Sequence, residues 1–407
     1  MNHGTSTESE PATTGWQPPS PAASGAPSLP AVFFAFLRLG ATAFGGPAMV
    51  AYIKDLAVQK RRWIDEASFQ RGVALCQTIP GATAMQTAAY AGLQARGFSG
   101  ALAAYAGFGL PAFILMLALT ALYRHTEALP VTLVLFQGLR AVVVALIANA
   151  ACNFAKTSIR SWPAAGLAGG AALALMIPIS PILVIVGCAF VGVSLLPDAE
   201  KRTATLGASL NGHLLRATLT LVATAGAGIA LLFWLDRLLF DLSVTMLQID
   251  LVAFGGGFAS VPLMQHEVVE ARGWMTARTF MDGIALGQIT PGPIVITATF
   301  AGYLVRGIAG AVVATLTVFL PSFVLVALIA PHFDRLQRLV VFRGATRGAL
   351  VSFVGLLASV TVRFAFATSW TIETAILALV AFGALRLRID VLWVVLGGVL
   401  LSVLAAR

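Results

Sequence analysis

The residues best suited to chemistry in this chain lie in two similar stretches, Gln77–Gly81 (QTIPG) and Gln288–Gly292 (QITPG). Proline removes a backbone N–H and glycine loosens the chain, so a Pro-Gly step inside an apolar helix frees polar groups that lipid cannot bond. A helix that restarts after such a break presents unpaired N–H groups at the positive end of its dipole. Such ends bind anions. Two matched breaks therefore predict an anion site between them, as in transporters with paired broken helices.

The expected site combines backbone at the two breaks with neutral side chains beside them. Its backbone donors are the N–H groups around Gly81–Thr83 and Gly292–Ile294. The residues expected at and beside the breaks are Gln77, Pro80, Gly81, Thr83, Gln86, Thr87, Gln288, Thr290, Pro291, Gly292 and Thr297. Neutral donors avoid the desolvation penalty of buried lysines. The alternative is that Pro-Gly only kinks a helix for packing, and two matched copies, each with Gln three residues before Pro, argue against it.

A second pair of glycine stretches precedes the breaks. Gly45-Gly46-Pro47 and Gly255-Gly256-Gly257 each follow a phenylalanine. They could be further unwound points that contribute to the site through Gly45, Gly46, Gly255 and Gly256, or small residues that let helices approach closely. Both interpretations stay open, because a close crossing beside a broken helix serves both purposes.

Charged residues inside apolar segments are few, and three of them matter. Arg38 falls within the first segment, where a buried cation would be a counter-charge for a dianion, or where the side chain could extend to the membrane surface. Arg140 lies deep in its segment with no partner evident nearby. Asp282 opens the second broken helix and is a candidate for proton coupling, but we favour a helix N-cap there. The sequence predicts no metal site and no cofactor.

Composition places the chain in a membrane. Of its 407 residues 58% are hydrophobic and 11% charged, with a mean hydropathy of +0.88, which is too little polar surface for a soluble globule. The net charge of +9 comes from short basic clusters between apolar stretches, such as Lys60-Arg61-Arg62. These clusters are typical of topology-setting loops, so we expect no nucleic-acid partner.

The chain divides into two similar halves. We expect a disordered tail at 1–30, a first repeat at 31–197, a linker with one helix at 198–240, and a second repeat at 241–407. The apolar segments are 31–53, 72–94, 98–123, 131–155, 163–178 and 181–197, then 213–235, then 241–264, 281–303, 307–331, 340–363, 370–385 and 389–406. The pairs 163–178/181–197 and 370–385/389–406 are short for crossings and could be tight hairpins, which gives about 10–13 membrane segments in all.

An internal repeat relates these halves. Phe44-Gly45-Gly46 matches Phe254-Gly255-Gly256 at an offset of 210, and Pro80-Gly81 matches Pro291-Gly292 at 211. The offset returns to 210 at Thr87/Thr297 and beyond. One linker helix between two repeats of six segments places the second repeat upside down, the inverted plan of many secondary transporters. The sequence therefore predicts an all-α polytopic membrane protein with two inverted repeats and broken helices.

These motifs resemble the paired signatures of the chromate transporter family in its long-chain, two-domain form. The motifs that carry the resemblance are Phe44-Gly45-Gly46-Pro47, Lys60-Arg61-Arg62-Trp63, Leu75-Cys76-Gln77-Thr78-Ile79-Pro80-Gly81, Phe254-Gly255-Gly256-Gly257 and Gln288-Ile289-Thr290-Pro291-Gly292-Pro293. The resemblance covers residues 31–407 and implies export of chromate across a bacterial inner membrane, driven by membrane potential or a proton gradient. Two departures from symmetry, Ala82 against Pro293 and Pro47 against Gly257, predict that the half-sites are not equivalent.

Rival functions remain at this point. Sulfate has the charge and nearly the shape of chromate, so an importer or exchanger of sulfate-like oxyanions is the first alternative. A membrane-embedded enzyme would need a nucleophile–base pair or paired aspartates at membrane depth, and an anion channel is a third alternative. No Walker A or catalytic motif is visible, so we expect no enzyme and a gradient-driven transporter. The expected partners are the oxyanion and the lipid bilayer, with a second copy of the chain as a further candidate.

Overall fold

The computed structural model describes residues 26–44, 48–177, 179–196 and 212–405, and within these ranges the chain is helical without a strand. The first half contains α1 (Leu29–Thr42), α2 (Ala48–Lys54), the π-helix η1 (Asp55–Lys60), α3 (Glu66–Thr78), α4 (Thr83–Thr126), α5 (Pro130–Ser158), α6 (Trp162–Ala174) and α7 (Pro181–Leu195). The linker helix is α8 (Gly212–Leu235).

The second half repeats this order. It contains α9 (Arg237–Val252), the 3-10 turn η2 (Gly257–Ala259), α10 (Ser260–Met264), the π-helix η3 (Gln265–Ala271), α11 (Ala277–Ile289), the 3-10 turn η4 (Ile294–Ile296), α12 (Thr297–Ile329), η5 (Ala330–His332), α13 (Phe333–Leu336), α14 (Val340–Ala367), α15 (Ile372–Arg386) and α16 (Val391–Ala405). Thus α1, α3, α4 and α5 correspond to α9, α11, α12 and α14, and the pair α6–α7 corresponds to α15–α16.

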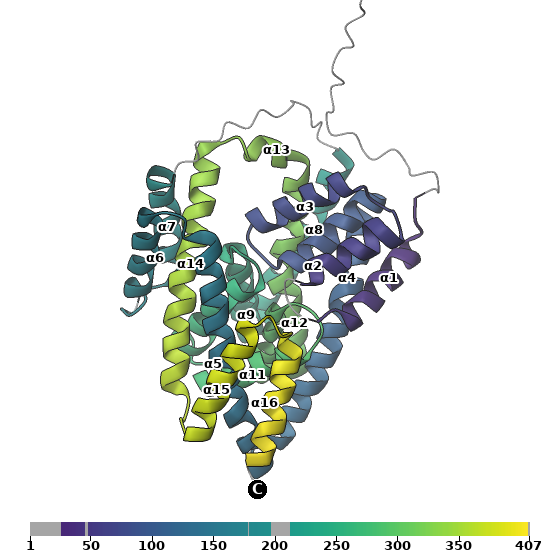
Figure 1. Cartoon of the computed structure of the whole chain (residues 1–407). Helices are drawn as coiled ribbons and strands as arrows, with labels where there is room; N and C mark the ends of the chain where they lie inside the picture. The colour runs from purple at the N-terminus through teal and green to yellow at the C-terminus, as the bar shows by residue number, and fades with distance from the viewer. Residues whose placement is uncertain (1–25, 45–47, 178, 197–211, 406–407) are drawn as a thin grey trace, which may run out of the picture.

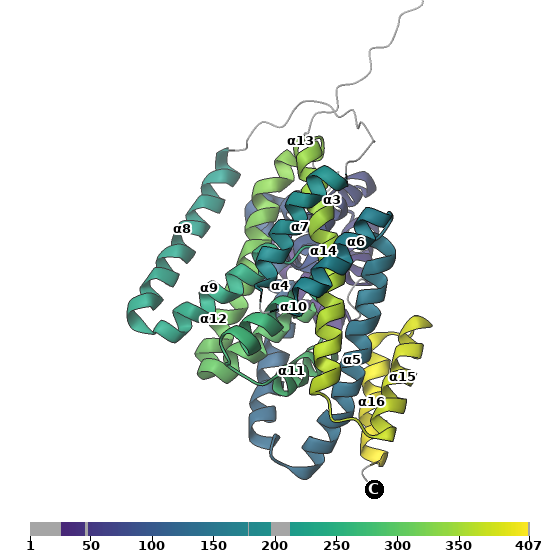
Figure 2. The same ribbon diagram turned by 90° about the vertical axis from the view of Figure 1, so that its left-hand side faces the viewer.

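The two halves are inverted with respect to one another. Helix α4 runs to the lower end of the molecule, where α5 begins, whereas α12 runs to the upper end, where α13 and α14 begin (Figures 1 and 2). Helices α5 and α14 therefore run in opposite directions and pack together, as do α4 and α12. The equivalent helices thus meet around the middle of the molecule.

The two short helix pairs are hairpins at opposite ends. Helices α6 and α7 have 13 and 15 residues, and α15 and α16 have 15 each, so they span only about 20–22 Å against a hydrocarbon core of about 30 Å. The α6–α7 hairpin lies in the upper part of the molecule and the α15–α16 hairpin at its lower end (Figures 1 and 2). Each hairpin packs on the long helix of the other half, α14 or α5, so the halves are interlocked.

Small residues allow the closest of these contacts. Gly344 and Gly348 face α7, and a Cβ on Gly348 would lie 2.1 Å from the carbonyl oxygen of Cys188. A Cβ on Gly192 would lie 2.6 Å from Gly344 O. These glycines at four-residue spacing let the backbones of α7 and α14 touch, as small residues do at helix crossings in membranes.

The helix boundaries correct several sequence expectations. The segments 31–53 and 241–264 are not single helices, because α1 ends at Thr42 and α9 at Val252. The expected boundary between 72–94 and 98–123 is confirmed within α4, because Arg96 and Gly97 are non-helical and a Cβ on Gly92 would lie 2.7 Å from Ala104 Cβ, so the chain turns back there. Five described helices are long and apolar enough to cross a bilayer. One of them is α8, which contacts chiefly α9 and α12 and stands apart from the rest (Figure 2).

Candidate functional site

The first break lies between α3 and α4. Helix α3 ends at Thr78, and α4 begins at Thr83 without a side-chain cap. Between them Gly81 has φ +117°, a conformation that L side chains rarely adopt. A Cβ there would lie 2.0 Å from Ser322 Oγ, so both conformation and space require glycine. The Pro-Gly step therefore ends one helix and starts another.

The second break repeats this geometry between α11 and α12. Helix α11 ends at Ile289, Gly292 has φ +112°, and the turn η4 leads into α12 at Thr297. A Cβ on Gly292 would lie 2.8 Å from Ala112 Cβ of α4. The two breaks thus have nearly the same backbone, and each faces the long helix of the other half.

A reciprocal pair of hydrogen bonds joins the breaks to the opposite halves. Gly81 N–H donates to Ala253 O at 2.9 Å, and Gly292 N–H donates to Ala43 O at 3.0 Å. Ala43 and Ala253 are themselves repeat equivalents that follow α1 and α9. These bonds correct the expectation that the glycine N–H groups bind an anion, because both are occupied. The donors that helix geometry leaves without an acceptor are the first-turn N–H groups of Thr83, Ala84 and Met85, and those of Ile294 and Val295.

Residues 255–257 bring the two restarting helices together. Gly255 and Gly256 have φ +99° and +92°, so the chain is unwound here, as one of the two interpretations predicted. A Cβ on Gly256 would lie 3.0 Å from Thr83 Oγ1, and one on Gly257 would lie 3.0 Å from Ile294 Cγ2. The stretch therefore contacts the first residue of α4 and the first residue of η4. The expected site residues Gly45 and Gly46 lie outside the described residues.

The three expected glutamines differ in their burial beside the breaks. Gln86 is 0% exposed, its Nε2 donates to Pro80 O at 2.6 Å, and its Oε1 has no partner. Gln288 is half-buried, and its Nε2 is buried without a hydrogen-bond partner. Gln77, the repeat equivalent of Gln288, is exposed. The amide of Gln288 is therefore the side-chain donor best placed to take a ligand.

The four expected threonines are close to the breaks but already bonded. Each donates its hydroxyl to a backbone carbonyl: Thr83 to Cys76 at 3.4 Å, Thr87 to Thr83 at 2.7 Å, Thr290 to Gly287 at 2.9 Å and Thr297 to Ile294 at 2.8 Å. This corrects the expectation that they are free donors. Such bonds satisfy hydroxyls within apolar helices and stabilise the restarting turns.

A buried carboxylate that the sequence reasoning missed lies against the first break. Asp250 of α9 is 0% exposed, and its Oδ2 accepts from Ser322 N at 2.8 Å and from Ser322 Oγ at 2.7 Å. Ser322 Oγ in turn accepts from Ala82 N–H at 2.9 Å. Asp250 Oδ1 has no partner. The apolar stretch 241–264 holds two acidic residues, Asp241 at its start and Asp250 in its interior, and an acid in the interior was the signal that could have found it.

A second buried acid, Asp282, is held by a cation. Arg140 Nε and Nη2 donate to its two carboxylate oxygens, both at 2.7 Å, and the Tyr123 hydroxyl donates to Oδ2 at 2.9 Å. The N-cap expectation for Asp282 is wrong, because Thr276 caps α11 and Asp282 lies a turn further in. The expectation that Arg140 has no partner is also wrong, because Arg140 bonds both carboxylate oxygens of Asp282. This bidentate pair ties α5 to α11.

Arg38 is not a buried counter-charge. Its side chain is exposed on α1, where Val32, Phe36 and Gly40 form the buried face. Because the buried residues recur every four positions, position 38 points away from the core. The structure thus places Arg38 on the outer surface.

The family now follows from comparison with known proteins. A family model described as Chromate transporter matches residues 30–193 and again residues 240–403. The chain belongs to the chromate transporter family. It is 44% identical over 382 residues to an uncharacterized transporter of Methanocaldococcus jannaschii, covering 93% of this chain and 94% of that protein. No solved structure matches.

Relatives named for chromate transport are more distant but match nearly as much of the chain. The chromate transport protein of Cupriavidus metallidurans is 30% identical over 389 residues, 91% of this chain and 92% of the relative. That of Pseudomonas aeruginosa is 30% identical over 384 residues, 88% and 86% of the two chains. The double match and the five long apolar helices make this transporter a multi-pass membrane protein.

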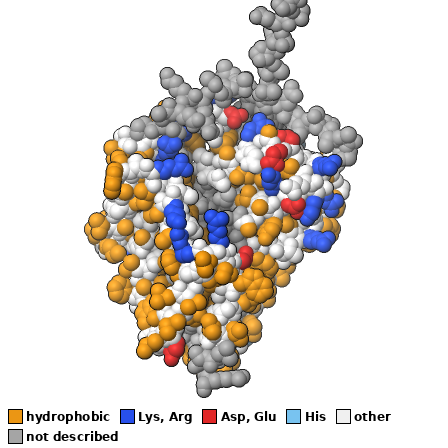
Figure 3. Space-filling model, in the orientation of Figure 1, with side chains coloured by type: hydrophobic (Ala, Val, Ile, Leu, Met, Phe, Trp, Pro, Cys, Tyr) orange, Lys and Arg blue, Asp and Glu red, His pale blue; other side chains and the backbone are white. Residues whose placement is uncertain are grey.

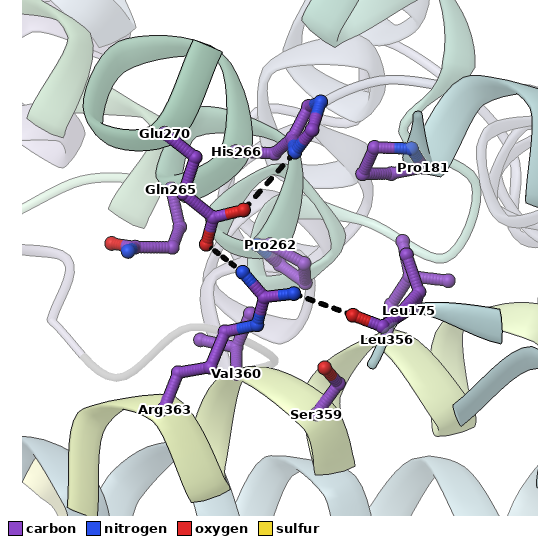
Figure 4. Close-up of a pocket in the computed structure, with 10 residues that line it drawn as sticks. All are labelled: Leu175, Pro181, Pro262, Gln265, His266, Glu270, Leu356, Ser359, Val360 and Arg363. Carbon is purple, nitrogen blue, oxygen red and sulfur yellow. Dashed lines mark hydrogen bonds and ion pairs between the residues drawn. The ribbon is translucent and has the colours of Figure 1, made fainter. Parts of the chain in front are cut away.

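This chromate transporter family member also has a polar cluster at the tip of its α6–α7 hairpin (Figure 4). Arg363 of α14 donates to Leu175 O at the tip and pairs with Glu270 of η3, which bonds His266 Nδ1 at 3.2 Å. At the other hairpin, Arg386 donates to Asn153 Oδ1, and Asn153 is the repeat equivalent of Arg363. Both hairpin tips are therefore bonded at the same position of a long helix.

Proposed function

We propose that the chain is a secondary transporter that exports chromate across the bacterial inner membrane. The observation that carries the proposal is the meeting of two restarting helices at residues 255–257, with Thr83 on one side and Ile294 on the other. Helix N-termini bind anions through free N–H groups and the helix dipole. Relatives that match most of the chain are named chromate transport proteins. The anion lies between the first turns of α4 and η4.

Each part of the site has a separate task in this proposal. The first-turn N–H groups of Thr83, Ala84 and Met85 bind the anion from one side, and those of Ile294 and Val295 from the other. Gln288 Nε2, buried without a partner, adds a neutral donor. Gly256 and Gly257 keep side chains out of the space between the two turns. Within the described part of the chain, no lysine or arginine bonds to these groups, which favours release of the anion.

The membrane potential supplies a sufficient driving force for export. Moving one charge through 100 mV is worth about 2.3 kcal/mol, so a dianion leaving an interior-negative cell gains about 5 kcal/mol. Lys and Arg side chains gather around a hollow in the upper part of the face in Figure 3, where they raise the local anion concentration. Export therefore needs no hydrolysis of a nucleotide.

The proposal is tested by flux of labelled chromate and sulfate in inverted membrane vesicles. Chromate uptake into these vesicles, abolished when the potential is collapsed, is the expected result. Uptake of sulfate in preference to chromate, or movement in the opposite direction, indicates the sulfate-like importer or exchanger. Flux that does not saturate with chromate concentration, together with single-channel currents in a planar bilayer, indicates a channel. Absence of anion flux in vesicles that contain folded protein contradicts the proposal.

A further inference from the structure

We propose that Asp250 is a proton-binding site whose protonation is linked to anion binding at the first break. This inference rests on the proposed function, because the anion it concerns is the one bound at the start of α4. Asp250 is on α9, and Ser322 of α12 connects it to Ala82, the residue before α4. It is therefore two hydrogen bonds from the backbone that precedes the anion-binding turn.

The environment of Asp250 favours a proton on one particular atom. Its Oδ2 accepts both the N–H and the O–H of Ser322, while Oδ1 has no partner and the residue is 0% exposed. A charged carboxylate buried without a cation is costly, and a proton on Oδ1 removes the charge without disturbing Oδ2. The step is the binding of one proton from solution at Oδ1 and its later return to solution.

The groups around Asp250 offer no competing charge. Tyr105 of α4 is the titratable side chain that faces it, and the Tyr105 hydroxyl donates to Phe319 O at 2.6 Å. Helices α8, α10 and α12 contribute no charged group to its surroundings, as far as the described residues extend. Asp282, the other deeply buried acid, differs because Arg140 bonds both of its oxygens. Asp250 is thus the buried acid with room for a proton.

The hydrogen-bond chain explains why proton and anion bind together. Ala82 N–H donates to Ser322, and Ser322 donates to Asp250, so a negative charge on Asp250 competes with an anion for the positive end of α4. Protonation removes that repulsion and strengthens anion binding. By linkage, anion binding promotes protonation by the same factor. Coulomb repulsion between a charged Asp250 and a dianion bound beyond these two hydrogen bonds weakens binding of the dianion on the order of tenfold to a hundredfold.

A proton fits this position better than a sodium ion. Sodium requires several oxygen ligands, whereas the groups that meet Asp250 Oδ2 are N–H and O–H donors. One free carboxylate oxygen suffices for a proton. The chemistry of the neighbours therefore selects the smaller cation.

The test is chromate affinity as a function of pH for the full-length protein in lipid nanodiscs, wild type against Asp250→Asn. The wild-type affinity should fall at high pH relative to that of the variant, by tenfold or more across the titration, and the two should agree at low pH. Taking the ratio cancels the protonation of chromate itself. Asp236→Asn is the matched control, because Asp236 caps the same helix, pairs with exposed Arg306, and asparagine caps equally well. Its profile should match that of the wild type.

The outcomes separate this inference from the function on which it rests. Parallel pH profiles for wild type and Asp250→Asn overturn the role of Asp250 and leave chromate binding intact. No chromate binding by the wild type overturns the proposed function. If Asp250→Asn does not fold, wild-type calorimetry in buffers of different ionisation enthalpy, at a pH where the anion is fully deprotonated, should show proton uptake on binding. Zero uptake, or a requirement for sodium, contradicts the inference.

Discussion

The two breaks have the same backbone but different chemistry around it. Gly81 and Gly292 share a left-handed φ, and each donates its N–H to the alanine that follows the first helix of the opposite half. The residue after each glycine differs. Ala82 N–H donates to Ser322 Oγ, whereas the equivalent Pro293 has no N–H to donate.

The residues that pack around the two breaks differ in a way that matches the change from Ala82 to Pro293. The repeat equivalent of Ser322 is Ala112, which has no acceptor, and the equivalent of Asp250 is Gly40. Donor and acceptor are thus both present at the first break and both absent at the second. Because the second break lacks the N–H, the serine hydroxyl and the carboxylate together, the absence of an N–H at Pro293 leaves no buried acceptor there without a donor. The two breaks therefore share their backbone geometry, while among the described residues the Ala82–Ser322–Asp250 connection to a carboxylate belongs to the first break alone.

The largest effect is expected at the Arg140–Asp282 pair, which exists in one half only, since the equivalent residues are Leu350 and Arg71. Asp282→Leu leaves a buried arginine without its partner and should lower the free energy of unfolding by about 3–5 kcal/mol. The double variant Arg140→Leu/Asp282→Leu leaves neither charge without its partner, so its free energy of unfolding should return most of the way to that of the wild type. Thermal unfolding in detergent measures both, and additive losses in the double variant contradict a pairwise interaction.

The breaks themselves should tolerate an added methyl group unequally. Gly81→Ala places Cβ against Ser322 Oγ at 2.0 Å, whereas Gly292→Ala meets Ala112 Cβ at 2.8 Å. Both incur the strain of positive φ, about 1–2 kcal/mol, and the first adds a clash and disturbs the Ser322 hydrogen bonds. Gly81→Ala should therefore lose more stability and transport. Equal losses in the two variants argue against unequal half-sites.

The glutamines should separate in the same assay. Gln288→Leu removes a buried amide donor and should lower chromate flux about tenfold or more. Gln77→Leu alters an exposed side chain and should have a smaller effect at equal expression. If Gln288→Leu retains wild-type flux, the Gln288 side chain does not take part in binding the anion.

Ala82→Pro should lower stability less than the losses expected for Asp282→Leu and Gly81→Ala. Ala82 has φ −76° and follows a glycine, as Pro293 does, so proline fits and the change deletes only the N–H bond to Ser322. A loss of about 0.5–1.5 kcal/mol in the free energy of unfolding is expected. Pro293→Ala is the matched control and should change stability less. A larger loss for Pro293→Ala contradicts the comparison.

The sequence predicted the repeat, the inversion and the two stretches where helices end, because Pro-Gly acts locally and the offset shows which positions correspond. It could not predict partners that only packing brings together. Ser322 meets a residue 240 positions away, and Asp282 meets an arginine 142 positions away. The glycine N–H groups were misjudged for the same reason, since their acceptors, Ala253 and Ala43, belong to the opposite half.

The most direct test of the anion site is the chromate affinity of Thr83→Pro beside that of Thr83→Ala. Thr83 is the first residue of α4, where proline is well accommodated, so the proline variant removes one anion donor and keeps the helix. The alanine variant removes the same side chain but retains the N–H. The site described above predicts a loss of about tenfold for Thr83→Pro and near wild-type affinity for Thr83→Ala. Equal affinities for both variants and the wild type would contradict anion binding at the start of α4.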